Sequence, residues 1–194
     1  MWVRGAAIRP VPSFAVVNEG ILEQVERALA AEGEEAESEL EGWFERFEKT
    51  QPQVAEHVSR VLARPLDETA LALGYFLSVA VWLAFDRAFR GRLGEVTEDA
   101  LKASESALTL EEELRATHAE EPLDFDDVMA IEQPGILGFV HEHLDAALEA
   151  SSDGKDVDVD DVHLVYRTVL LEILALSHAV TAPQGTKTNF EMMA

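Results

Sequence analysis

Cysteine is absent from the sequence, which excludes disulfide bonds, thiol catalysis and zinc–thiolate sites. Positive charge is scarce as well: 15 lysines and arginines stand against 38 aspartates and glutamates, for a formal net charge of -23. Such a field repels phosphate groups, so we expect neither nucleic acid nor an anionic membrane as a partner. Phosphate-binding loops, dinucleotide fingerprints and the common hydrolase and kinase motifs are missing too, so no familiar enzyme class is indicated.

Long apolar runs are few. The longest covers residues 70–85 and falls short of the roughly 20 residues that a membrane span needs. Arg9, Pro10 and Pro12 interrupt the only stretch that could resemble a targeting signal. We therefore expect a soluble, cytoplasmic protein whose run at 70–85 is a buried core helix.

What the sequence has in abundance is helix-forming residues. Ala, Leu and Glu together make up 76 of the 194 residues, and no long segment alternates apolar and polar positions. These features predict an all-α fold: a single-domain bundle of about seven to eight helices over residues 1–182. We expect residues 1–17 to form an extended arm, 97–117 a polar connecting helix and 183–194 a flexible tail.

Two segments of the chain resemble each other. Residues 43–62 align with 125–144 at a constant offset of 82, which places Gln51-Pro52 on Gln133-Pro134. After nine extra residues the following apolar helices align at an offset of 91, with Tyr75 on Tyr166. The pattern predicts two pseudo-repeated helical units, about 38–90 and 124–182, with helices that begin at the two prolines and a core that neither unit closes alone. Chance similarity between amphipathic hairpins is the alternative.

Candidate metal ligands gather at two places. His141 and Asp145 stand one helical turn apart, where they could grip one ion. Asp156, Asp158 and Asp160 occupy the first, third and fifth positions of a calcium-binding loop, but Asp161 stands where that loop needs Gly, and the closing Glu is missing. We expect no tight metal binding at either place and no cofactor. Instead, we expect Asp160 or Asp161 to cap the helix that follows.

Other polar residues have two interpretations each. The carboxylates Asp124, Asp126 and Asp127 could serve as acid and base, but they are equally expected at a helix N-terminus. Arg167 and Glu172 interrupt the last apolar helix, and we expect both to extend to its rim. If either faces the core it needs a partner, for which Tyr75 is a candidate, and it could mark a ligand pocket.

No function follows directly from these patterns. We expect a non-enzymatic protein that acts through protein–protein contacts, as an adaptor, a regulator or a small homo-oligomer. One alternative is an acidic inhibitor or immunity-type protein that neutralises a basic partner by charge complementarity. Another is a metal- or ligand-dependent enzyme that uses His141, Asp145 and nearby carboxylates.

Overall fold

The computed structural model describes residues 11–31, 33–117, 132–151 and 158–184, and within them the fold is all-α, as predicted. Leu93 and Val180 form an isolated antiparallel bridge, and these described residues contain no strand. The short helix expected from Asp124 lies outside them. The elements are η1 (Ser13–Ala15), α1 (Glu19–Leu29), α2 (Glu34–Thr50), α3 (Pro52–Leu62), α4 (Glu68–Ala88), α5 (Glu98–Thr117), α7 (Pro134–Ser151) and α8 (Val159–Ala179).

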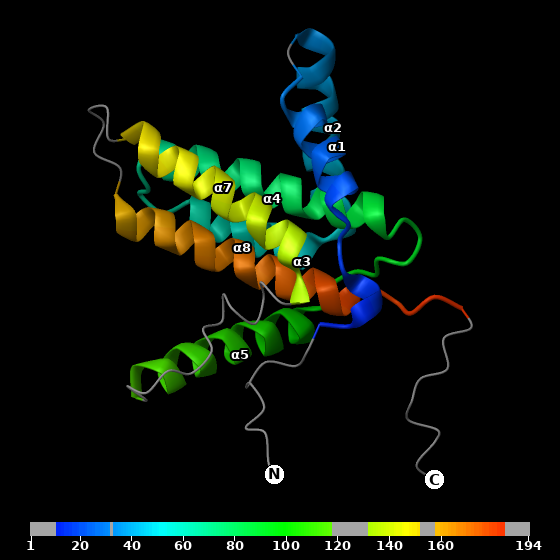
Figure 1. Cartoon of the computed structure of the whole chain (residues 1–194), viewed down its shortest axis with the longest axis vertical. Coiled ribbons are helices and arrows are strands. Elements are labelled where there is room, and N and C mark those ends of the chain that lie inside the picture. The colour runs from blue at the N-terminus through cyan, green and yellow to red at the C-terminus, as the bar shows by residue number, and fades with distance from the viewer. Residues whose placement is uncertain (1–10, 32, 118–131, 152–157, 185–194) are drawn as a thin grey trace.

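The centre of the molecule is a pair of parallel helices, α4 and α8, each 21 residues long (Figure 1). Their first turns meet where the Asp67 backbone N–H donates to Asp161, 2.8 Å away. Just beyond their last turns, the Gly94 N–H donates to the Ala179 carbonyl at 3.0 Å. At Gly74 of α4 the packing is tight on two sides, because a Cβ atom there would lie 2.5 Å from a Leu62 methyl carbon of α3 and 3.3 Å from a Val165 methyl carbon of α8. A larger residue at this position would force Leu62 to shift.

The other helices surround this pair (Figure 1). α7 packs on α4, and α3 packs on α8 and α4. α5 packs on α8, whereas α1 and α2 form a hairpin that rises away from the body after contacting α4. The exposed ends of this hairpin are therefore free to meet solvent or another molecule.

Local side-chain chemistry explains where three of the helices start. Asn18 caps α1 by accepting from the Gly20 N–H, and Asp67 caps α4 by accepting from the N–H groups of Thr69 and Ala70. α8 is capped by Asp158, not by Asp160 or Asp161, so that expectation was wrong. Asp161 instead contacts the start of α4, because its carboxylate accepts from the Asp67 backbone N–H.

Two buried glutamines fasten the segments that precede α1 and α5. Gln133 donates to the Ala15 carbonyl at 2.7 Å and accepts from the Val17 N–H at 3.1 Å. Gln51 makes the same pair of bonds to residues two apart, donating to the Gly94 carbonyl and accepting from the Val96 N–H, each at 2.9 Å. The expected N-terminal arm is therefore not simply extended: residues 13–15 form a 3-10 turn, and Ala15 and Val17 are buried.

The two prolines that follow these glutamines begin helices, α3 at Pro52 and α7 at Pro134, as the sequence predicts. The capping aspartates of α4 and α8 also stand 91 residues apart, the offset found in the sequence. Duplication of the whole unit stays a prediction, because superposition of residues 51–88 on 133–179 is the measurement that decides it.

By length and composition alone, α4 and α8 are each apolar enough to cross a membrane. Two-thirds of each apolar window is buried inside the protein, which is compatible with a soluble protein whose core helices are unusually apolar. We therefore treat both as core helices.

Leu77 is completely buried on α4, and we expect Leu77→Ala to lower the free energy of unfolding by about 2–5 kcal/mol, because the truncation leaves a cavity. Urea denaturation measures this. Leu110→Ala is the matched control, because Leu110 is 46% exposed, and it should change stability by less than about 0.5 kcal/mol. Equal midpoints for the two variants would mean that α4 does not form the core.

Gln133→Met should also destabilise the protein, by at least about 1–3 kcal/mol, since it keeps side-chain size but leaves the buried Ala15 carbonyl and Val17 N–H unpaired. Gln24→Met, at an exposed position of α1, serves as the control. If both variants unfold at the parental urea concentration, the buried amide contributes nothing to stability.

Candidate functional site

The predicted metal ligands do not come together. His141 lies half-buried on α7 and its Nε2 is 2.8 Å from the Tyr166 hydroxyl on α8, whereas Asp145 is exposed. Among the described residues, no three His, Asp or Glu side chains gather in a group that could hold a metal ion. His141 is thus engaged in a contact between helices, and the expectation of no tight metal site stays a prediction.

The acidic residues near the start of α8 act as caps. Asp158 accepts from the Asp160 N–H, and its own N–H donates to Asp67. Asp160 is exposed at the first turn of α8, where a carboxylate complements the helix dipole. Asp156 and the carboxylates of 124–127 lie outside the described residues.

Glu172 contradicts the expectation that it extends to the rim, because it is only 1% exposed in the middle of α8. Neither carboxylate oxygen has a well-formed hydrogen bond to any group in the described part of the chain. Burial raises the pKa of Glu172 well above its ordinary value, and the Ser78 hydroxyl on α4 opposes this only weakly. Tyr75, the suggested partner, is 44% exposed, whereas Arg167 does sit at the rim and pairs with Glu112.

The raised pKa predicts how stability depends on pH. Below the ordinary Glu pKa, near 4.3, the carboxyl is protonated in both folded and unfolded states, so it adds no pH dependence to stability. As the pH rises toward the folded-state pKa, only the unfolded state ionises, so the folded protein loses stability by up to about 1.4 kcal/mol per pH unit. Glu172→Gln should remove this loss and become progressively more stable, relative to the parent, between pH 4 and neutral pH.

Urea titrations at several pH values measure this difference. Glu142→Gln, which removes a carboxyl from the exposed face of α7, is the control for a simple change in surface charge. A parent-minus-variant difference for Glu172→Gln that does not change with pH would show that Glu172 is not held neutral.

The described surface has a groove of about 420 Å³ between α4 and α7. Its lining is largely apolar: Glu68, Thr69, Ala72, Leu73, Phe76 and Ala147. At one end Phe76 contacts His143, with ring centroids 4.8 Å apart, and His143 in turn packs on Phe139 at 4.3 Å. Phe76 thus links the groove to an aromatic cluster with His143 and Phe139 on α7.

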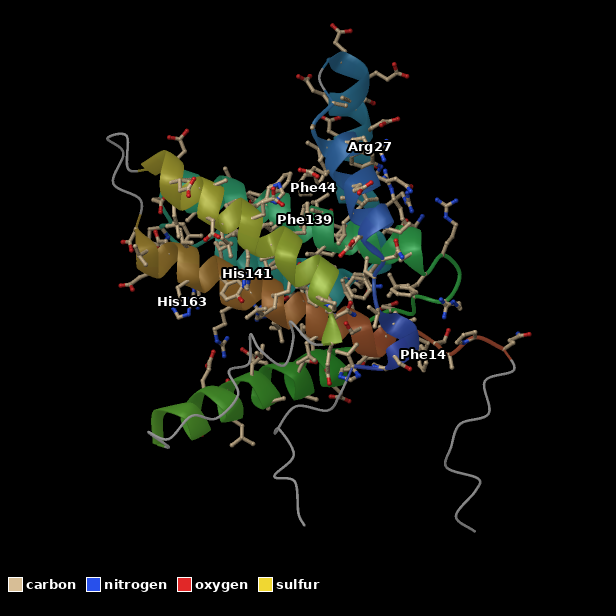
Figure 2. The ribbon with its side chains drawn as sticks, viewed as in Figure 1. Phe14, Arg27, Phe44, Phe139, His141 and His163 are labelled. Carbon is tan, nitrogen blue, oxygen red and sulfur yellow. The ribbon has the colours of Figure 1, made fainter. Side chains whose placement is uncertain are left out.

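The apolar surface continues beyond the groove onto the hairpin. Tyr75 directly precedes Phe76 on α4, and its ring meets Phe44 of α2 edge to face, with centroids 6.1 Å apart. One turn earlier on α2, Leu40 is 37% exposed. Figure 2 shows Phe44 and Phe139 on the side where the hairpin meets the body, whereas His141 and His163 lie toward α8. We name this region the α2–α4–α7 surface; its residues are Leu40, Phe44, Ala72, Tyr75, Phe76 and Ala147.

The border of this surface is acidic. Residues 19–50, which include the hairpin, contain eleven glutamates and three basic residues, and every glutamate described in α2 is exposed. Of the bases, Arg46 is bound to Asp86 at 2.6 Å and Arg27 donates to the Glu23 carbonyl. Glu68 adds a carboxylate at the groove itself. An apolar centre within an anionic border is an arrangement that suits an amphipathic cationic ligand.

Comparisons with family models, with curated proteins and with solved structures find no match to this chain. The α2–α4–α7 surface was also missed in the sequence, because its residues come from three helices far apart along the chain. One signal could have indicated it: Leu40 and Phe44 form an i, i+4 apolar pair on a helix otherwise rich in glutamate.

Proposed function

We propose that this protein is a non-enzymatic binding protein that docks a cationic, amphipathic segment of a partner protein on the α2–α4–α7 surface. The observation that supports this most directly is the exposure of Tyr75 and Leu40, 44% and 37%, beside an open apolar groove. Large apolar side chains that cluster on an otherwise acidic surface are typical of an interaction site.

The charge of the border selects the kind of partner. Lysines and arginines on the flanks of an apolar segment would meet the exposed glutamates of α2 and Glu68, while nucleic acid and anionic membranes would be repelled. An inhibitor that neutralises a basic protein is the second candidate, and the same acidic hairpin favours it. We place this activity in the cytoplasm.

Affinity capture with two exposed-residue variants tests the proposal. Tyr75→Arg introduces a cation into the α2–α4–α7 surface, and Leu110→Arg introduces one on α5 at a position of similar exposure, 46% against 44%. We expect partners that bind both the parent and Leu110→Arg but not Tyr75→Arg. These partners should be released at about 0.5 M salt, because screening weakens the ionic part of the interaction.

Each captured protein is then identified, purified and titrated against the three forms of the chain. A partner that binds all three equally would place its site elsewhere and contradict the proposal. A partner that is lost with Tyr75→Arg but withstands high salt would show that the surface binds without charge complementarity, and the cationic part of the proposal would be wrong.

A further inference from the structure

We infer that the docked segment is an α-helix of about two to three turns that lies antiparallel to α4. This inference rests on the proposed docking function and specifies the conformation of the ligand. Three observations carry it: how α5 covers α8, where α1 leaves α4, and what the groove offers to a backbone.

α5 shows how a helix covers one of the two long helices. It starts beside the end of α8, where Gly94 bonds to Ala179, and reaches the middle of α8, where Glu112 pairs with Arg167 at 2.8 Å. α5 therefore runs antiparallel to α8. Its Leu101 and Leu108 are buried.

α1 begins in the corresponding way but does not follow α4: it contacts α4 and then rises away from the body (Figure 1). The segments before α1 and α5 are fastened by Gln133 and Gln51 through the same pair of bonds. α5 then has 20 residues, whereas α1 has 11, which is shorter by about two and a half turns. α1 meets α4 near its end, where Arg87 donates to the Gln24 carbonyl at 3.0 Å, and the chain then turns into α2.

The part of α4 that this leaves uncovered is the groove. At the offset of 91 that aligns α4 with α8, the position of Arg167 corresponds to Phe76. Arg167 is held under α5, whereas Phe76 lines the groove. At the aligned position of α8 a helix is therefore in place, whereas no outer helix among the described residues fills the groove beside α4. Because α4 has Phe76 where α8 has Arg167, a docked helix would place an apolar side chain here rather than a carboxylate.

The groove also suits a helix better than an extended peptide. A bound strand gains its affinity from backbone hydrogen bonds to a sheet edge, and the described residues contain no strand. α4 and α7 use their backbone groups within themselves along the groove. A helix needs no backbone partner and offers apolar side chains at i, i+3, i+4 and i+7.

Selection from a displayed library of random 16-residue peptides tests the inference with a defined probe. The parent chain is the target, and Ala72→Arg, which fills the groove at an exposed position, is the counter-target. Ala103→Arg, an exposed alanine on α5, is the matched control, and Phe76→Arg is a second groove variant. We expect enriched peptides with apolar residues at helical spacing and flanking Lys or Arg, which bind the parent and Ala103→Arg at least tenfold more tightly than the groove variants.

A proline placed at the centre of an enriched peptide then separates the two proposals. Loss of affinity by tenfold or more supports a helical ligand, because proline breaks the helix while charge and most apolar surface remain. Unchanged affinity with the proline would overturn the helical inference and leave the docking surface intact. Peptides that bind the groove variants as well as the parent, or no enrichment at all, would overturn both.

Discussion

The rest of the structure depends on the contact between α4 and α8. Both helices are apolar almost all round, so each has to be buried on most of its faces, and each covers part of the other. Asp67 and Asp161 tie their first turns together, and Gly74 leaves room beside α4 for Leu62 and Val165. The outer helices cover what remains. The large negative charge is consequently confined to the outside, where it borders the faces that the outer helices leave open.

The sequence predicted the features that a few neighbouring residues determine. Asn18, Asp67 and the two prolines start helices because a cap or a fixed φ acts within one turn. The cap of α8 was misplaced because Asp158, Asp160 and Asp161 are chemically equivalent, and only the approach of α4 decides which carboxylate serves which helix. Local sequence signals therefore locate the helices, whereas tertiary contacts determine which partner each polar side chain has.

The misjudged polar residues have the same explanation. Arg167 and Glu172 both interrupt an apolar helix, but α5 offers Arg167 a carboxylate at the rim, whereas Glu172 is buried beside Ser78 of α4. Tyr75 was a candidate partner for such a group in the core, but it lies at the surface against Phe44 of α2. The candidate site was not predicted for the same reason. An open surface remains where the neighbouring helices leave α4, and the sequence pattern of α4 alone does not contain that information.

The two glutamine contacts also constrain the order in which the chain can fold during synthesis. The Val17 N–H cannot form its bond until Gln133, 116 residues later, has been synthesised. The Val96 N–H bonds to Gln51, which is synthesised 45 residues earlier. The first helices to leave the ribosome therefore stay without their final anchor until most of the chain has emerged, with the apolar face of α4 uncovered meanwhile. The amino-terminal part cannot complete its fold as an independent unit, and the nascent chain depends on its own acidity, or on a chaperone, to avoid aggregation over that interval.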